Sequence, residues 1–290
     1  MNGILLIDKP TGWTSSDVVA KLRGILHERR IGHSGTLDPM ATGLLVVFVG
    51  RATRAAEFAE ADDKRYLAGL RLGLVTDTQD ITGSILTQTN ATVTEAQLKE
   101  ALSLFEGDLL QIPPMYSAIK IDGRKLYQIA RKGGEVERKP RKITVSTLDL
   151  LGIVGDDWLL DISCSKGTYV RTLCHDIGTA LGCGGCMSSL RRLKAGSFTV
   201  EKALTLQQVQ EAADTGRVTD LLLPVDTLFS LYPSLTVDAE GERRIRCGNE
   251  LSLPDADDGT YRVYNVRGNF LALSAAEQGV LRTIKSFFEV

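Results

Sequence analysis

The chain has 290 residues, of which 43% are hydrophobic and 24% charged, an ordinary balance for a globular protein. Its longest apolar run, Leu44 to Val49, is far shorter than the roughly 18 residues that a membrane-spanning helix needs. The first residues lack the basic start and long apolar stretch of a signal peptide, and five cysteines, an odd number, do not suggest a disulfide framework. These features argue against membrane and secreted proteins, and we expect a cytoplasmic one.

The N-terminal part reads as a mixture of strands and helices. A short apolar strand at Gly3–Asp8 is followed by a helix from Thr14 to Leu26, because Thr14-Ser15-Ser16-Asp17 carries N-cap chemistry. Ile31–Thr42 contains two glycines and a proline and is predicted as a loop. In chain order we then expect a core strand at Leu44–Val49, a short helix at Thr53–Ala61, a strand at Lys64–Leu74 and a capped helix from Thr94 to Phe105.

Past Pro113-Pro114, the predicted elements change character towards the C-terminus. A helix at Lys125–Lys132 is stopped by Gly133-Gly134. Strands at Ile143–Ile153 and Trp158–Cys164 and helices at Tyr169–Leu181 and Thr205–Ala213 follow. A linker bracketed by Pro224 and Pro233 leads to strands at Tyr261–Val266, Phe270–Leu273 and Val280–Phe287, which we interpret as a small all-β unit.

Charge is unevenly distributed. The formal net charge of the whole chain is −2, which argues weakly against a general nucleic-acid binder. Residues 120–142, however, hold nine Lys or Arg against three acids, a local net charge of +6. By itself such a run is most often a solvated charged loop, but it also suits a surface that contacts phosphates.

The densest chemical feature is the loop from Gly32 to Gly43. Its glycines allow a ligand to approach the backbone closely, and Pro39 stiffens the segment directly after Asp38. A carboxylate on a stiff loop just before a core strand is well placed for catalysis. Local physics equally allows an Asx-type turn, in which Asp38 only bonds its own backbone.

Residues 32–45 resemble the catalytic motif of the TruB-type tRNA pseudouridine-55 synthases. Further motifs of that family recur in the same order along the chain, so that the resemblance covers about residues 3–230. They are Leu6–Ser15, Lys64–Tyr66 with Leu72–Asp80, Pro113–Lys120, Ser165–Arg171 and Leu190–Arg192. Residues from about 232 onward resemble, more faintly, the small RNA-binding β-domain called PUA.

The resemblance implies a fold, a reaction and a substrate. The fold is a mixed α/β (α+β) catalytic domain at 1–231 with an antiparallel-rich central sheet, plus a PUA-like domain at 232–290. The reaction turns uridine 55 in the T-loop of tRNA into its C-linked isomer after base flipping. Because that reaction conserves atoms and involves no redox change, we expect no cofactor and no metal. We also expect a monomer that binds the tRNA T-stem-loop without an obligate protein partner.

By resemblance, the catalytic residues are Asp38, Tyr66 and Arg171. Asp38 is the nucleophile or base, and attack at C1′, at the C2′ hydrogen or at uracil C6 all remain open. Arg171 is expected to keep Asp38 ionised and oriented, although it also suits a helix surface. Tyr66 is expected to stack beneath the uracil and to offer its hydroxyl as a proton acceptor; alternatively it is a core tyrosine.

The remaining expected contacts are with the substrate. Tyr169 and Leu190 should line the base pocket, although both would also fill a core, and Lys9 with Pro10 should shape and neutralise its floor. His33 should fill the space left by the flipped base, with acid–base catalysis as the rival interpretation. The expected contacts to the RNA backbone are Lys120, Arg131, Lys132, Lys139 and Arg141.

Two groups of residues have some features of metal-binding motifs. Cys174-His175 with Cys183 and Cys186 has irregular spacing and lacks a second paired motif, so that a turn is favoured over zinc. Asp77 and Asp80 fail the calcium-loop pattern, and the resemblance puts them beside the site as hydrogen-bonding partners. Two rival functions remain: an RNA-binding or tRNA-folding module without catalysis, and a pseudouridine synthase for other RNAs.

Overall fold

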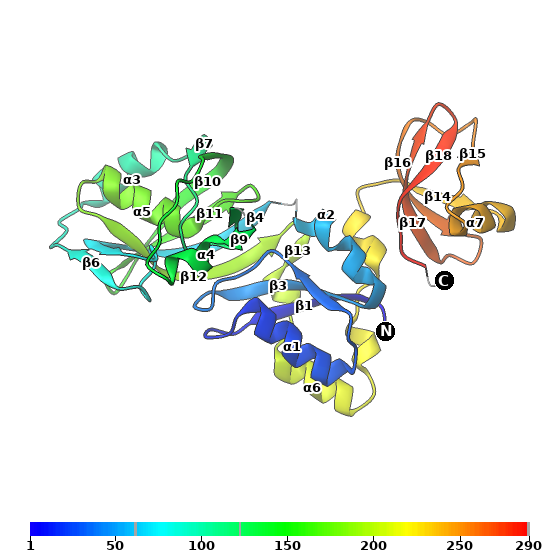
Figure 1. The fold of residues 1–290 in the computed structure, drawn as a ribbon, viewed down its shortest axis with the longest axis horizontal. Helices are drawn as coiled ribbons and strands as arrows, with labels where there is room; N and C mark the ends of the chain where they lie inside the picture. The colour runs from blue at the N-terminus through cyan, green and yellow to red at the C-terminus, as the bar shows by residue number, and fades with distance from the viewer. Residues whose placement is uncertain (61–62, 122, 289–290) are drawn as a thin grey trace.

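The computed structural model describes residues 1–60, 63–121 and 123–288. A long central sheet runs through the first part of the chain in the order β1-β3-β12-β4-β11-β10-β7, with β2 beside β3 and β13 beside β12 (Figure 1). Its strands are β1 Gly3–Lys9, β2 Ile31–Ser34, β3 Thr42–Val49, β4 Lys64–Leu72, β7 Gly107–Gln111, β10 Arg141–Val154, β11 Asp157–Cys164, β12 Gly185–Ala195 and β13 Phe198–Thr199. Within the described residues its neighbouring strands are antiparallel except β12 and β3, which confirms the expected antiparallel-rich sheet.

Helices and short hairpins are attached to this sheet. The α-helices are α1 Ser15–Leu26, α2 Ala56–Glu60, α3 Glu95–Ser103, α4 Leu126–Ala130, α5 Val170–Ala180, α6 Leu206–Asp214 and α7 Ala239–Arg246. The 3-10 helices are η1 Gly50–Ala55, η2 Val200–Lys202, η3 Val218–Leu221 and η4 Val225–Phe229. Two small hairpins pair β5 Leu74–Thr76 with β6 Ile85–Gln88, and β8 Lys120–Ile121 with β9 Arg124–Lys125. Thr14, Thr94 and Thr205 each cap a helix through a complete capping box, which fixes these helix starts locally.

Two apolar cores hold the helices on the sheet. At one end, α1 and α6 cover β1 and β3, burying side chains such as Leu22, Leu45 and Val209. At the other, α5 packs Leu173 and Ile177 against β12 and β4. Each fully buried aliphatic side chain contributes about 1.5–3 kcal/mol of transfer free energy, so these faces fix where α5 lies on the sheet.

The C-terminal unit is a five-stranded sheet in the order β14-β16-β17-β18-β15, which Figure 1 shows at the far end of the molecule. Its strands are β14 Ser234–Val237, β15 Leu251–Ser252, β16 Gly259–Asn265, β17 Phe270–Glu277 and β18 Val280–Ser286. It also contains α7, so the expectation of an all-β unit was incomplete. Asp238 caps α7, and Ile245 is the large side chain by which this otherwise charged helix packs into the core.

An aromatic cluster joins the C-terminal unit to the rest of the protein. The Phe229 ring lies 5.3 Å from Phe58, 6.1 Å from Phe270 and 5.7 Å from Phe287, measured between ring centroids. Lys285 adds a 2.6 Å ion pair to Glu57. Contacts of this kind hold the two units together through apolar burial more than through charge.

The predicted elements need correction at several places. The predicted loop Ile31–Thr42 begins with strand β2, which pairs with β3, and only the residues after Ser34 form a loop. Strand β12 was not predicted, and α4 is shorter than expected. The predicted helix end at Ala61 lies outside the described residues. Among the helices that are described, none is long and apolar enough to cross a membrane.

Candidate active site

The loop that carries Asp38 runs from Gly35 to Ala41, between β2 and β3, and the segment after β1 braces it. The Ser15 hydroxyl accepts a hydrogen bond from the Leu37 N–H (2.9 Å) and donates to the Leu37 carbonyl (3.3 Å). The Gly12 N–H donates to the Pro39 carbonyl (2.8 Å). Motifs that are separate in sequence therefore meet here, and together they fix the backbone on both sides of Asp38.

Lys9 forms the floor beneath this loop. Its side chain is buried, and its ammonium donates to the carbonyls of Pro10 (2.9 Å), Trp13 (2.6 Å) and Pro39 (3.3 Å). Burial lowers the pKa of Lys9 to about 8, against the opposing attraction of Asp38. Lys9 therefore supports the backbone beneath the loop of Asp38, and its expected role at the floor of the base pocket stays a prediction.

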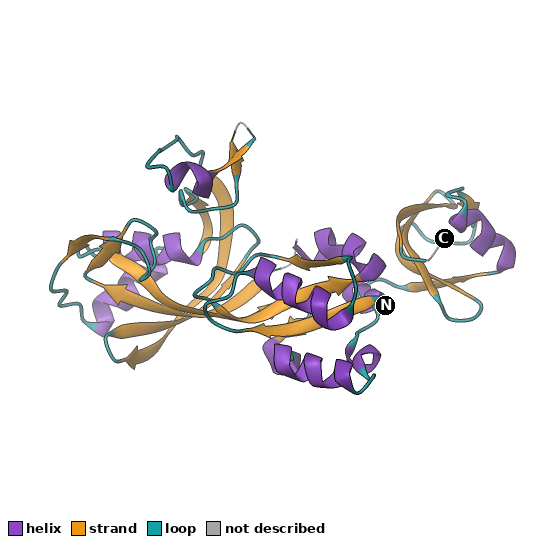
Figure 2. Ribbon diagram, turned by 60° about the horizontal axis from the view of Figure 1, so that its bottom comes forward, coloured by secondary structure: helices purple, strands orange, loops and turns teal. Residues whose placement is uncertain are grey.

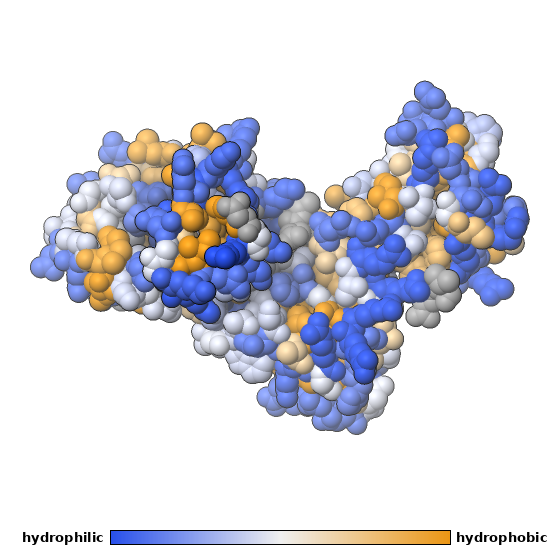
Figure 3. Space-filling model, in the orientation of Figure 1, coloured by the Kyte–Doolittle hydropathy of each residue, from blue (hydrophilic) through white to orange (hydrophobic). Residues whose placement is uncertain are grey.

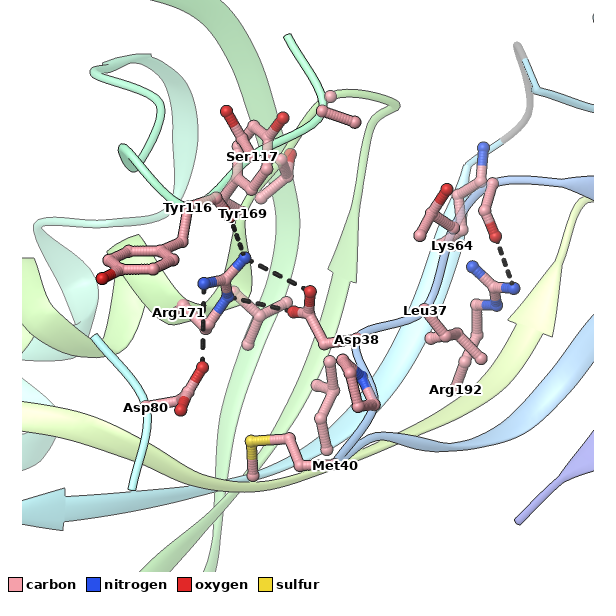
Figure 4. Close-up of a pocket in the computed structure, with 18 of the residues that line it drawn as sticks. Leu37, Asp38, Met40, Lys64, Asp80, Tyr116, Ser117, Tyr169, Arg171 and Arg192 are labelled. Carbon is pink, nitrogen blue, oxygen red and sulfur yellow. Dashed lines mark hydrogen bonds and ion pairs between the residues drawn. The ribbon is translucent and has the colours of Figure 1, made fainter. Parts of the chain in front are cut away.

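Asp38 is paired with Arg171 at the base of a pocket, as Figure 4 shows. Arg171 Nε lies 3.0 Å from one carboxylate oxygen of Asp38, and Nη2 donates to the other at 3.3 Å. The same guanidinium donates to the carbonyls of Thr78 (3.1 Å) and Tyr116 (2.8 Å), so it cannot swing away from the carboxylate. This two-point contact orients Asp38 as well as neutralising it.

Helix α5 aims Arg171 at the carboxylate, and a residue from β7 fixes the start of that helix. The side-chain amide of Gln111 accepts a hydrogen bond from the Tyr169 N–H (2.8 Å) and donates to the Tyr169 carbonyl (3.1 Å). Tyr169 is the N-cap residue of α5, two positions before Arg171. Sequence reasoning did not identify Gln111 because its contact spans 58 residues and no local motif marks it.

Two opposing effects set the ionisation of Asp38. Burial raises the pKa of its carboxyl, and the Arg171 guanidinium lowers it again. About a third of the Asp38 side chain is open to the pocket, whereas Arg171 is only 6% exposed. The carboxylate is therefore accessible to a substrate while its partner is enclosed in the protein.

Asp80 holds the other side of Arg171. Its carboxylate lies 3.7 Å from Arg171 Nη1 and accepts a hydrogen bond from the Thr82 N–H (3.0 Å). Asp77 instead accepts from the Ser84 N–H (2.8 Å), which closes a turn. Asp77 therefore lies in the expected turn, and Asp80 lies beside the site as expected.

The pocket is a cavity of about 1370 Å³, larger than a typical small-molecule pocket. Asp38, Tyr66, Tyr169, Arg171 and Leu190 all line it, as predicted. Cationic side chains surround them: Lys64, Arg131, Arg141, Lys142, Lys166 and Arg192. A large, positively lined cleft with apolar and aromatic walls suits a nucleotide within a polymer.

The two tyrosines belong to different walls. Tyr66 lies on β4, directly opposite Arg192 of β12 in the pairing register, and burial raises the pKa of its phenol. Burial also raises the pKa of Tyr169, at the start of α5. Both phenols are therefore neutral at physiological pH unless a nearby charge acts on them.

His33 lies in β2, opposite Val47 of β3, and not on a flexible loop. A strand position limits how far its backbone can move. The described residues that line the pocket do not include Lys9, His33, Lys120, Lys132 or Lys139. The expected contact of these five residues with substrate therefore stays a prediction.

Most of the basic segment 120–142 stands away from the central sheet, as the projecting β8–β9 hairpin and α4 show in Figure 2, and its last two residues, Arg141 and Lys142, begin strand β10 of that sheet. Arg131 lies over the Tyr127 ring at 5.4 Å, and Arg131 and Arg141 reach the pocket wall. Lys120, Lys132 and Lys139 are exposed. Within the described part of this segment, most cations are therefore available to solvent or to a polyanion; Asp122 lies outside the described residues.

The cysteines do not gather into a site. Cys174 and Cys186 are buried, and burial raises the pKa of Cys186 to about 11. No group of three or more His, Cys, Asp or Glu within residues 1–60, 63–121 and 123–288 has the arrangement of a metal site.

Arg192 also lines the pocket, although the sequence analysis assigned it no role. It belongs to the Leu190–Arg192 motif.

Comparison with known proteins identifies relatives over nearly the whole chain. Residues 23–170 match the N-terminal domain of the TruB family pseudouridylate synthases, and residues 171–230 match the C-terminal domain of tRNA pseudouridylate synthase B. The tRNA pseudouridine synthase B of Clostridium kluyveri is 40% identical over 294 residues, 99% of this chain and 100% of its own. That of Syntrophotalea carbinolica is 47% identical over 249 residues, 86% and 81% of the two chains.

Solved structures agree with this relationship. A chain of a Cbf5–Nop10–Gar1 complex superposes with a TM-score of 0.76 at 26% identity, covering 99% of this chain and 85% of that one. A chain of an H/ACA RNP bound to a substrate RNA containing 2′-deoxyuridine gives a TM-score of 0.75 at 24% identity, which supports the fold. The similarity in fold extends into the C-terminal unit.

Proposed function

The chain belongs to the TruB family of pseudouridylate synthases, and from this premise we propose that it converts uridine 55 in the T-loop of tRNA into pseudouridine. The relatives named tRNA pseudouridine synthase B support the choice of tRNA. The observation that carries the proposal is the Asp38–Arg171 pair at the base of a cationic pocket. A protein that only bound RNA would gain nothing from a carboxylate at the point where it meets an anionic ligand.

The proposed reaction is an isomerisation. The N1–C1′ bond of uridine breaks, the uracil rotates, and a C5–C1′ bond forms; C5 then loses a proton and N1 gains one. Because atoms and electrons balance within the nucleotide, the scheme requires no cofactor. Asp38 acts as the nucleophile or base, and Arg171 keeps it ionised and oriented, which is worth several orders of magnitude in rate when the reacting geometry is fixed.

The uracil must leave its stack before Asp38 can reach it, at a cost of about a few kcal/mol. We propose that Tyr66 stacks beneath the flipped base and that its phenolic oxygen, in the phenolate form, accepts the C5 proton, while Tyr169 and Leu190 form the other walls. His33 fills the vacated space in the RNA. Its place in β2 supports a rigid steric role better than a mobile proton carrier.

RNA backbone contacts complete the proposal. Lys120, Arg131, Lys132, Lys139 and Arg141 would clamp the T-stem-loop from the projecting segment. We further propose that residues 1–231 form the catalytic domain and that residues 232–290 are a PUA-like domain attached to it. The enzyme would act as a cytoplasmic monomer, without an obligate protein partner.

Replacing Asp38 with Asn tests the proposed chemistry. Asn keeps the shape of the side chain but removes the charge, so turnover should be abolished while affinity for RNA stays within about tenfold. The measurement is pseudouridine formation in a T-stem-loop RNA, with binding measured in parallel. Wild-type protein that binds this RNA but forms no pseudouridine would favour the RNA-binding module, and wild-type activity on other RNAs alone would favour a different substrate.

Two substitutions separate the possible roles of His33. His33→Phe keeps a flat ring and should retain substantial activity, whereas His33→Ala should lose about 1–3 kcal/mol of stacking free energy, or up to roughly 150-fold in rate. Single-turnover rates of both variants on the same RNA provide the comparison. Equal and nearly complete loss in both variants would make the imidazole a chemical participant.

A further inference from the structure

Arg192 is a buried cation that the proposed chemistry has not yet used. It is 1% exposed, on β12, and its guanidinium donates from Nε to the Leu44 carbonyl (2.6 Å) and from Nη2 to the Gly35 carbonyl (3.0 Å). Both partners are neutral. Among the residues that the structure describes, Arg192 is in no ion pair, unlike Arg171.

Burying a guanidinium against neutral groups is energetically unfavourable, because its charge loses hydration without gaining a counter-charge. A neutral amide could donate to the same two carbonyls. The contacts to Leu44 and Gly35 therefore explain the position of the side chain but not its charge. A buried charge of this kind is favoured where negative charge develops nearby during a reaction.

The neighbour that can carry such charge is Tyr66. Strands β4 and β12 pair Tyr66 with Arg192 directly, and both side chains line the pocket. Burial raises the pKa of the Tyr66 phenol, and the charge of Arg192 is the strongest effect that lowers it. The two residues thus form a buried phenol–guanidinium couple, separate from the Asp38–Arg171 pair.

Arg192 also connects this couple to the loop of Asp38. Gly35, whose carbonyl it holds, lies three residues before Asp38 and has a φ of +70°. On the other side, Gly43 leaves no room for a side chain, because a Cβ there would collide with the backbone of Arg192. One residue therefore contacts both ends of the catalytic loop and the tyrosine that faces it.

We propose that Arg192 is a positioning residue of the isomerisation: its charge stabilises Tyr66 as a phenolate, which accepts the proton that C5 loses after the C5–C1′ bond has formed. In that step the C–H electron pair restores the uracil ring, and the proton converts the phenolate to a phenol. This inference rests on the proposed function. The guanidinium itself transfers no proton, so its contribution acts entirely through Tyr66.

The first test needs no substrate. The tyrosines are replaced with 3,5-difluorotyrosine, whose phenol titrates closer to neutral pH, and the Tyr66 signal in ¹⁹F NMR is assigned by its loss in Tyr66→Phe. In Arg192→Gln, which keeps donors for the carbonyls but no charge, the Tyr66 titration should move up by about one pH unit or more. Arg192→Lys should leave it near the wild-type midpoint and serves as the second variant if Arg192→Gln does not fold.

The second test uses single-turnover pseudouridine formation. Arg192→Gln should slow the reaction by about 10–100-fold and move its rising pH limb upward, yet slow a Tyr66→Phe enzyme by less than about threefold. The proposal would be overturned if the Tyr66 titration did not move in Arg192→Gln, or if Arg192→Gln slowed the wild-type and the Tyr66→Phe enzymes by the same factor. Arg192 would then have a structural role alone. If wild-type protein were inactive on the T-stem-loop, the proposed substrate would fail, while the NMR result would still decide whether Arg192 acts on Tyr66.

Discussion

The pocket and the C-terminal unit both contain several arginines but use them in opposite ways. In the C-terminal unit, each of three arginines faces a glutamate on the surface: Arg243–Glu240 at 2.7 Å, Arg246–Glu242 at 2.8 Å and Arg282–Glu250 at 2.7 Å. In the pocket, Arg171 is enclosed and pairs with a carboxylate that is open to the pocket, while Arg192 donates to two backbone carbonyls and, among the described residues, pairs with no carboxylate.

The basic segment beside the pocket and the C-terminal unit also differ in net charge. Residues 120–142 carry a net charge of +6, whereas residues 232–290 contain seven Lys or Arg against nine Asp or Glu. The face of the C-terminal unit seen in Figure 3 is mostly hydrophilic, but three of the arginines of this unit already have carboxylate partners. The lesson is that the partner of a cation, rather than the number of cations, decides whether a surface can attract an anion.

The largest expected contrast between the two regions is in turnover. Arg171→Met should slow pseudouridine formation by about 10²–10³-fold, because Asp38 loses its orientation and its counter-charge. Burial already raises the pKa of Asp38, and without Arg171 that pKa should rise further, so the acidic limb of the pH–rate profile should move to higher pH. The matched control is Arg243→Met, which breaks an exposed pair and should change the rate by less than twofold. If Arg171→Met and Arg243→Met slowed the reaction by similar factors, the enclosed arginine of the pocket and the exposed arginine of the C-terminal unit would not differ in function.

A smaller contrast is expected in RNA binding. Changing Arg131, Lys132, Lys139 and Arg141 together to Gln should weaken binding of a T-stem-loop by about 10–100-fold and make its log–log salt dependence shallower by up to about 3, since each phosphate contact contributes roughly 0.7–0.9. The control changes Arg243, Arg244, Arg246 and Arg282 to Gln and should leave the salt slope unchanged. If the control flattened the slope as much as the first variant, the C-terminal unit would be a phosphate-binding surface after all.

Local signals explain which parts of the fold could be predicted. The helix starts at Thr14 and Thr94 were predictable because their capping bonds span three residues. Strand β12 was not, since its run of charged residues hides the alternation and two irregularities interrupt its register with β4. Helix α7 was missed for a related reason: it is mostly charged, and little beyond Ile245 marks its buried face.

The residues of the site also differ in whether a local sequence signal could identify them. Asp38, Tyr66 and Arg171 could be named because each belongs to a sequence motif, and the structure brings all three to one pocket. Gln111 and the guanidinium contacts of Arg192 could not, because their partners are distant in sequence and are backbone groups without a residue signature. Motifs thus predicted the residues that line the pocket better than the residues that support them.

The placement of β1 has a consequence for the order in which a new chain can fold. One edge of this strand pairs with β3, but the other is closed by hydrogen bonds from Ile4 to Leu223 (2.8 Å) and from Asp8 to Leu204 (2.9 Å). Strand β1 therefore waits for residues that are made about 200 positions later, which takes on the order of ten to forty seconds at ordinary rates of synthesis. Because Lys9 at the end of β1 supports the loop of Asp38, this loop should reach its final position in a nascent chain only after residues 204–223 have been made.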